Sequence, residues 1–168
     1  MPEHGAEGVL ITGVYGSGKS SVAAEITYLL EQQNRPYALL DLDYFGWVGD
    51  HATGYRMMLR NLVAVAPHYR EAGIDRFVVA YFVRDADVLR SVRDALGVPL
   101  RVARLAVPWP EIERRLASDV TSGRGDDLRD AAASVTAGEG EGVEDIVVDS
   151  DRPVATVARD LMAWLEWT

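Results

Sequence analysis

The feature that most constrains this chain is the spacing of four residues near its beginning. Gly13, Gly18, Lys19 and Ser20 satisfy the pattern G-x-x-x-x-G-K-[ST], and an apolar run at 9–11 precedes them. Four apolar residues then follow at helical spacing: Val22, Ile26, Leu29 and Leu30. This order predicts a buried strand, a tight loop and a helix that begins at the loop.

A loop of this composition binds phosphate for physical reasons. Glycines let successive backbone N–H groups point into one concavity, and the following helix adds its positive N-terminal end. In a P-loop of this kind Lys19, at the solvent-facing end of the loop, reaches the β- and γ-phosphates of a nucleotide, and the Ser20 hydroxyl ligates magnesium. The residues that we expect to contact the nucleotide are Gly13, Tyr15, Gly16, Ser17, Gly18, Lys19, Ser20 and Ser21. The alternative, a glycine-rich turn that only connects a strand to a helix, is disfavoured because the required strand and helix are both present.

Apolar runs and helical periodicities alternate along the rest of the chain. Further strands are predicted at 37–42, 76–83, 99–107 and 145–150. Helices are predicted at 54–73, 85–97, 109–116 and 153–167. Strands that are spaced by helices pair in parallel, with helices on both faces of the sheet. We therefore expect an α/β, three-layer P-loop NTPase fold with a five-stranded parallel sheet, in a single domain that spans 1–168.

Composition and charge narrow the range of partners. The 168 residues carry a net charge of −9 and include no cysteine, which excludes a disulfide framework and a thiol nucleophile. Lys and Arg are scattered, so the basic footprint that nucleic-acid binding needs is missing. The first residues lack the features of a signal peptide, and no apolar run is long enough to span a membrane. We expect a cytoplasmic monomer or homodimer that binds small molecules rather than nucleic acid or membrane.

Two carboxylates follow the second predicted strand. Asp41 and Asp43 are two positions apart, so both side chains can point to the same face, toward the crevice where ligands bind in such sheets. Like charges this close repel unless a cation or a hydrogen-bond donor lies between them. Magnesium-ATP beside an acceptor hydroxyl would supply both. The alternative for the pair alone is a solvated acidic turn, and the nearby P-loop favours a site.

The stretch GVYGSGKS at 13–20, followed one strand later by DLD at 41–43, resembles the small P-loop kinases related to shikimate, gluconate and adenylylsulfate kinases. The resemblance implies that Asp43 orients or deprotonates the acceptor hydroxyl and that Asp41, with Ser20, lies near magnesium. The segment RNLVAVAPHYREAG resembles the helix after this motif in adenylylsulfate kinases, which implies that Arg60 and Asn61 contact the acceptor. A solvated helix face is the alternative for these two residues.

In these kinases a polar segment that bears arginines closes over the phosphates, and 118–130 stands where this small mobile lid is expected. The resemblance implies catalytic roles for Arg124 and Arg129. Arginines that a closing loop delivers stabilise the charge that spreads over the transferred phosphoryl group. The alternative is that these arginines form surface ion pairs with acidic neighbours.

The same resemblance places two further segments beside the nucleotide. Arg115, before the lid, is expected near the nucleotide, and Arg152 and Pro153 are expected on the adenine side. These two residues belong to the turn DSDRP at 149–153. A helix start capped by Ser150 or Asp151 is a second interpretation of this turn, and it is compatible with the first.

Together these features predict an ATP- and magnesium-dependent kinase that moves the γ-phosphoryl group of ATP to a hydroxyl or phosphate of a small molecule. The alternative from a different class is a nucleotide-binding regulatory or accessory module without efficient phosphoryl transfer. A polynucleotide 5′-kinase is disfavoured by the acidity of the chain. The pair of Asp41 and Asp43 favours the kinase, because a sensor needs no carboxylate on the acceptor side.

Overall fold

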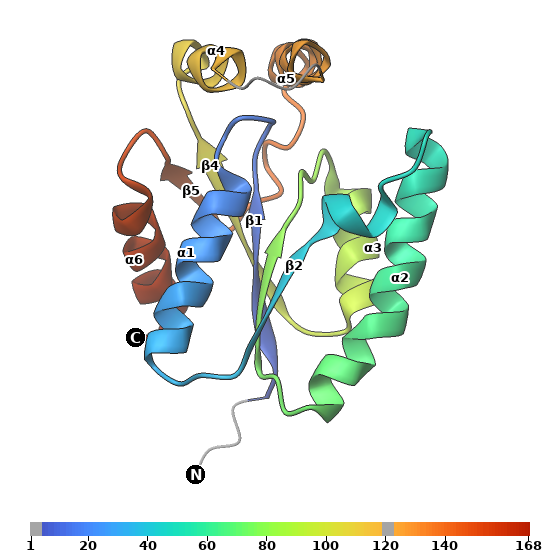
Figure 1. The fold of residues 1–168 in the computed structure, drawn as a ribbon, viewed down its shortest axis with the longest axis vertical. Helices are drawn as coiled ribbons and strands as arrows, with labels where there is room; N and C mark the ends of the chain where they lie inside the picture. Colours follow the sequence, from blue (N-terminus) through green and yellow to red (C-terminus); the bar gives the residue numbers. More distant parts are fainter. Residues whose placement is uncertain (1–4, 119–122) are drawn as a thin grey trace.

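The computed structural model describes residues 5–118 and 123–168, and within them strands and helices alternate (Figure 1). The strands are β1 Glu7–Thr12, β2 Tyr37–Asp41, β3 Arg76–Ala80, β4 Leu100–Ala106 and β5 Ile146–Asp149. The helices are α1 Lys19–Gln32, α2 His51–Glu71, α3 Ala86–Leu96, α4 Trp109–Ala117, α5 Arg124–Ala137 and α6 Val154–Leu165, with the 3₁₀ helix η1 at Leu42–Gly46. Among the described residues, none of these helices has the length and apolar content that a membrane crossing requires.

The described strands form one five-stranded parallel sheet in the order β2-β3-β1-β4-β5. α1 and α6 cover one face of the sheet, and α2 and α3 cover the other (Figure 1). Because all the strands run in one direction, their carboxyl ends and the loops after them gather at one edge. The loop after the central strand β1 therefore lies between the ends of β3 and β4. The predicted α/β P-loop architecture is confirmed.

The apolar sequence of β1 explains its central place. Val9 and Ile11 pack with α1 and α6, whereas Leu10 packs with α2 and α3, and all three side chains are fully buried. A strand that is buried on both faces needs a continuous apolar run. Near the other end of the chain, the buried Trp167 donates a 3.0 Å hydrogen bond from its indole N–H to Glu7. This contact ties the segment after α6 to the start of β1.

Two helices lie beyond the carboxyl edge of the sheet rather than against its faces (Figure 1). α4 and α5 pack on each other through Ile112, Leu116 and Ala131, and this small cluster also includes Val14 and Tyr15 from the loop after β1. The segment after β4 thus covers the phosphate loop with apolar contacts.

The sequence did not predict α5. The run 118–131 is polar, and only Leu128 and Ala131 of this segment join an apolar cluster, so the periodicity that marks a helix is weak. The structure places a helix at Arg124–Ala137, ended by Gly138 with a φ of 65°, where the sequence indicated a polar lid segment. Residues 119–122 of the predicted lid lie outside the described residues.

Candidate active site

The phosphate loop joins β1 to α1 with backbone conformations that glycine allows. Gly13, Gly16 and Gly18 have φ angles of 151°, 81° and 93°, in the half of the map that other residues rarely adopt. A Cβ atom at Gly16 would also lie 3.1 Å from Leu116 Cγ and 3.3 Å from Ile112 Cγ2. The glycine at position 16 therefore allows both the turn and the close packing of α4 on the loop.

Lys19, the only lysine of the chain, begins α1. Its side chain is 8% exposed, and Nζ donates hydrogen bonds to the carbonyl oxygens of Gly13 at 2.8 Å and Val14 at 3.2 Å. Burial lowers the pKa of Lys19 from 10.5 to about 8, and the negative charges of Asp43 and Asp41 oppose this shift. The prediction that Lys19 faces solvent is wrong, because the loop carbonyls draw the ammonium group inward.

The hydroxyl of Ser20 donates a 2.7 Å hydrogen bond to Oδ2 of Asp41, which joins the first turn of α1 to the end of β2. Oδ1 of the same carboxylate accepts a 3.3 Å hydrogen bond from the backbone N–H of Asp43. β2 ends at Asp41 and η1 begins at Leu42. The strand therefore ends before Asp43, because the carboxylate of Asp41 caps η1 and the chain leaves the sheet there. Both carboxylates still lie near enough to Lys19 to affect its pKa.

Asp43 lies beside the phosphate loop, in a position that the surrounding protein partly shields from water. Although the side chain is exposed at its outer side, partial burial raises the pKa of Asp43, an effect that Lys19 opposes and Asp41 reinforces. A carboxylate with a raised pKa accepts a proton more readily than an ordinary aspartate. The electrostatics of Asp43 therefore suit a proton acceptor.

The two α2 residues that the sequence assigned to the acceptor differ in position. Asn61 donates a 2.6 Å hydrogen bond from Nδ2 to the carbonyl oxygen of Phe45 in η1, so it holds the segment that carries Asp43. Arg60 is exposed and forms no hydrogen bond or ion pair with any residue in the described ranges. The structure thus brings Asn61, and not Arg60, into contact with the segment that carries Asp43.

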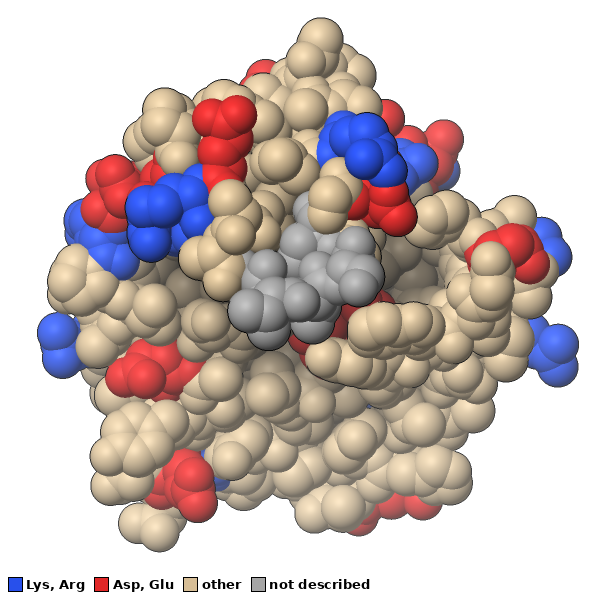
Figure 2. Space-filling model, turned by 45° about the horizontal axis from the view of Figure 1, so that its top comes forward, with Lys and Arg blue, Asp and Glu red and all other residues tan. Residues whose placement is uncertain are grey.

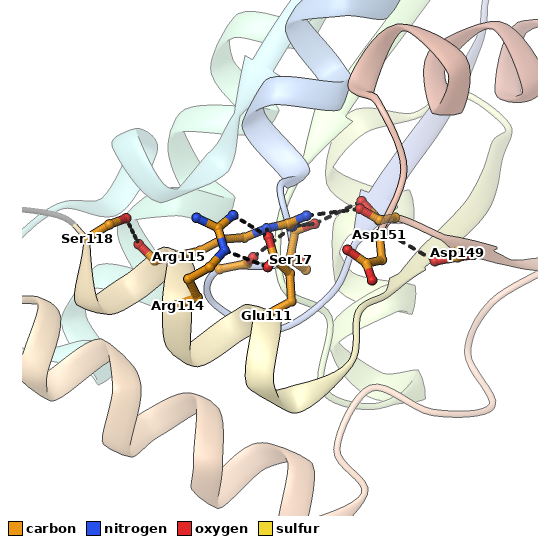
Figure 3. Close-up of polar contacts among 9 residues, drawn as sticks. Ser17, Glu111, Arg114, Arg115, Ser118, Asp149 and Asp151 are labelled. Carbon is orange, nitrogen blue, oxygen red and sulfur yellow. Dashed lines mark hydrogen bonds and ion pairs between the residues drawn. The ribbon is translucent and has the colours of Figure 1, made fainter.

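Arg115 of α4 donates hydrogen bonds to backbone carbonyl oxygens of the phosphate loop (Figure 3). Its guanidinium donates to the carbonyl oxygens of Gly16 at 3.2 Å, Ser17 at 3.3 Å and Ser150 at 3.1 Å, and to the carboxylate of Glu111 at 2.8 Å. The Ser150 hydroxyl also donates to the Ser17 carbonyl at 3.1 Å. Arg115 therefore joins α4, the phosphate loop and the turn after β5 through backbone carbonyls.

The turn that the sequence assigned to the adenine forms the start of α6. Pro153 is the N-cap residue of α6. Arg152 donates to the carbonyl oxygen of Asp149 at 3.0 Å and to the carboxylate of Asp160 at 2.8 Å. A helix does start at this turn, but the prediction that Ser150 or Asp151 caps it is wrong, because Pro153 is the N-cap residue and no side chain caps α6. Contact of the turn with a nucleotide stays a prediction.

The two lid arginines occur on α5. Arg129 is exposed and pairs with Asp126 of the same helix, which is the surface pairing that the sequence left open. Arg124 begins α5, and its side chain lies outside the described part of the structure. A catalytic role for either arginine stays a prediction.

Sequence reasoning missed three residues at this edge of the sheet: Tyr55, Tyr81 and Arg84. Burial, with smaller contributions from the charge of Asp43 and from the nearby Tyr55, raises the pKa of Tyr81 to about 12, and Arg84 acts in the opposite direction. Tyr81 and Arg84 follow β3, which ends at Ala80 and not at 83 as predicted. The available signal was this position, because residues directly after parallel strands meet at one edge.

No family model and no curated protein sequence matches this chain, but solved structures match it over nearly its full length. A sugar kinase from Janibacter sp. HTCC2649 is 18% identical and has a TM-score of 0.70, with 96% of this chain and 95% of that chain covered. The fold is that of the small P-loop kinases.

Two further structures of this fold were solved with ligands. The APS kinase CysC of Mycobacterium tuberculosis, in complex with AMPPNP and APS, is 22% identical with a TM-score of 0.63, over 96% of this chain and 98% of that chain. Shikimate kinase from Acinetobacter baumannii, in complex with shikimate, is 16% identical with a TM-score of 0.60, over 97% of this chain and 95% of that chain. These similarities confirm the P-loop kinase fold that the sequence resemblance implied.

The residues of this P-loop kinase fold that suit a magnesium ion are Ser20 and Asp41. A hydroxyl and a carboxylate whose oxygens lie 2.7 Å apart are the hard oxygen donors that Mg²⁺ prefers. Within 5–118 and 123–168, no group of three or more histidines and carboxylates could hold a metal by itself. The donor set therefore fits an ion that takes one or two protein ligands and completes its shell with water and phosphate oxygens.

Proposed function

We propose that this chain is an ATP-dependent phosphotransferase that moves the γ-phosphoryl group of ATP to a hydroxyl or phosphate of a small molecule. The observation that carries the proposal is the meeting of Lys19, Asp41 and Asp43 at the carboxyl edge of the sheet. Ser20 and Asp41 share a hydrogen bond, and Asp43 lies close enough to Lys19 to affect its pKa. The fold of the sugar, APS and shikimate kinases supports this proposal.

The proposed division of labour follows from these positions. The loop N–H groups and the Lys19 ammonium bind the β- and γ-phosphates, for which Lys19 exchanges its bonds to the loop carbonyls for bonds to phosphate. Asp43 orients the acceptor and takes its proton. A magnesium ion at Ser20 and Asp41 would offset the negative charge of the phosphates.

In this proposal α4 and α5 form the lid over the phosphates. Arg124 and Arg129 would stabilise the transferred phosphoryl group, and Arg115 would act by positioning the loop carbonyls. Arg152 and Pro153 would lie on the adenine side. The net charge of −9 supports a small-molecule acceptor over nucleic acid.

The proposal is tested by measuring ADP release and nucleotide binding with purified protein, Mg²⁺ and ATP across a panel of hydroxylated acceptors. We expect at least one acceptor to accelerate ADP release by about a hundredfold or more over water. Lys19→Met should abolish this activity and bind ATP weakly. Arg90→Ala is the matched control, because Arg90 is an exposed residue of α3 that pairs only with Asp87.

Two results would contradict the proposal in different ways. Tight ATP binding without acceleration by any acceptor would favour the nucleotide-binding regulatory module. Wild-type activity in the Lys19→Met variant would remove the phosphate loop from the mechanism. Acceleration that Asp43→Asn leaves unchanged would reject the role of Asp43 while keeping the kinase.

A further inference from the structure

Three tyrosines lie in the segments that follow β1, β2 and β3 at the carboxyl edge of the sheet. Tyr15 belongs to the tip of the phosphate loop, Tyr55 to the first turns of α2, and Tyr81 follows β3. All three rings are partly buried. Asp43 lies near enough to Tyr15 and to Tyr81 to raise the pKa of each, after the larger effect of burial. The sheet register agrees with this proximity, since Ala80, directly before Tyr81, is the partner of Asp41.

Backbone hydrogen bonds fix Tyr81 in this place. Its N–H donates to the carbonyl oxygen of Ile11 at 3.1 Å, and the N–H of Val83 donates to the Thr12 hydroxyl at 2.9 Å. Both acceptors directly precede the phosphate loop. The position of the Tyr81 ring beside the loop is therefore set by the rigid end of β1.

The phenol groups of these tyrosines are available to a ligand. Within the described ranges, none of Tyr15, Tyr55 and Tyr81 makes a side-chain hydrogen bond. A phenol both donates and accepts, so the phenols of Tyr15 and Tyr81 near the Asp43 carboxylate suit a ligand that carries several hydroxyls. A ring compound would in addition pack its apolar face on the aromatic rings.

The charges beside the tyrosines are mainly negative. Asp43 and Asp130 raise the pKa of Tyr15 after the effect of burial, and Arg84 opposes them. Lys19 and Arg115 also lie at the phosphate loop, and both are hydrogen-bonded to its carbonyl oxygens. Figure 2 turns this end of the molecule forward and shows acidic side chains recessed in the surface among uncharged residues. An acceptor with an anionic group would therefore meet like charge.

A further pair of aromatic rings, Tyr44 and Trp47, lies within four residues after Asp43. Tyr44 and Trp47 stack with ring centroids 5.4 Å apart, and they are 70% and 76% exposed. Exposed aromatic residues next to a site are suited to stacking on a ligand ring. This exposed pair lies on the same segment as the proposed proton acceptor, Asp43.

We infer that the acceptor is a hydroxylated ring compound without an anionic group, of the class of neutral sugars, nucleosides and aminocyclitols. Its ring contacts Tyr81 and Trp47, and one of its hydroxyls hydrogen-bonds to Asp43. This inference rests on the proposed phosphoryl transfer. In the reaction the acceptor oxygen bonds to the γ-phosphorus, its proton passes to Asp43, and the bond from the γ-phosphorus to the β–γ bridging oxygen breaks. ADP leaves with the electron pair of that bond.

The test uses acceptor pairs that differ mainly in one anionic group: adenosine with adenosine 5′-monophosphate, and glucose with glucuronate. 2-Deoxystreptamine is added as a cationic ring. Binding to the full chain with Mg²⁺ and a non-hydrolysable ATP analogue is measured by saturation-transfer NMR, and ADP release is measured with ATP. We expect the uncharged or cationic compounds to bind at least about tenfold more tightly than their anionic counterparts.

Variants locate the ligand. Trp47→Ala and Tyr81→Phe should raise the KM of the acceptor several-fold and leave the affinity for ATP unchanged. Tyr28→Ala is the control, since Tyr28 is a 53% exposed tyrosine of α1. Arg84→Gln should leave the binding of uncharged compounds intact, because they need no cation.

If the anionic member of each pair binds more tightly than the uncharged one, and Arg84→Gln abolishes that tighter binding, the inference is overturned while the kinase proposal stands. Absence of binding by every compound would overturn the inference as well. Preferential binding of the uncharged members without any acceleration of ADP release would keep the ligand class and reject the proposed phosphoryl transfer.

Discussion

The hydroxyl of Ser20 and the carboxylate of Asp41 meet at 2.7 Å across 21 positions of sequence. Ser20 belongs to the first turn of α1 and Asp41 ends β2, so the bond joins the phosphate loop to a strand that is not adjacent to β1. Asp43 is held next to this pair by the bond from its N–H to Asp41. Three oxygen-bearing groups with different proposed roles thus share one small region.

Substitution of the two aspartates separates these roles. Asp43→Asn keeps the shape but takes up no proton, so acceptor-stimulated ADP release should fall by about a hundredfold or more with little change in ATP affinity. Asp41→Asn should instead raise the magnesium concentration required for half-maximal activity, because a hard cation is held by oxygen charge. Initial rates over a magnesium titration measure both effects, and identical behaviour of the two variants would reject the separation.

The single lysine allows a direct test of pH dependence. Burial holds the pKa of Lys19 near 8 in the folded chain, against 10.5 ordinarily, so the folded protein releases this proton first as the pH rises. Folding stability should therefore increase between about 8 and about 10.5. Phosphate binding needs the ammonium form, so ATP affinity without magnesium should fall by up to about tenfold per pH unit above this pKa.

NMR of protein with ¹³C-labelled lysine follows one side chain through this titration. ATP should move the midpoint upward, since it binds the charged form. Lys19→Met is the control and should bind ATP weakly at every pH. A midpoint near the ordinary value of 10.5 in the free protein would show that the side chain is not buried in solution.

Arg115 and Arg114 form a matched pair on α4. Both bond to Glu111, but only Arg115 also reaches the backbone of the phosphate loop and Ser150 (Figure 3). Arg115→Met should lower the free energy of unfolding by about 2 kcal/mol, because hydrogen bonds from a charged donor are lost, and should weaken ATP binding. Arg114 is exposed, so Arg114→Ala should change the free energy of unfolding and the affinity for ATP only slightly. Equal effects in denaturant unfolding would argue against the bridging role of Arg115.

Alanine substitution at Gly16 and at Gly142 distinguishes the effect of backbone strain on stability from the effect of packing. Their φ angles are 81° and 79°, but a Cβ at Gly16 would press on Leu116 and Ile112, whereas nothing lies within 4 Å of one at Gly142. Gly142→Ala should cost about 1 kcal/mol of stability, from strain alone. Gly16→Ala should cost more and should also weaken ATP binding, since it displaces α4 from the loop. Comparable losses in both variants would show that the contact with α4 is unimportant.

The predictable part of the site is the part that local sequence encodes. The strand, loop and helix around Gly13 and Lys19 follow from glycine conformations and short apolar periodicities, and all of them occur. The place of Asp43 in η1 did not follow, because the capping of η1 by Asp41 ends the strand one residue earlier than its apolar run. α5 did not follow either, since its few apolar residues pack only against α4 and the loop.

By itself the sequence determined the phosphate loop and the order along the chain of the five strands and of the helices other than α5, because each of these depends on neighbours within a few positions. Only the tertiary structure decided which groups meet. The bond from Arg115 to Ser17 spans 98 positions, and Tyr15 and Tyr81, which act on the same carboxylate of Asp43, come from the segments after β1 and β3. Such contacts depend on the parallel order of the strands, which gathers the ends of distant segments at one edge. No local pattern carries that order.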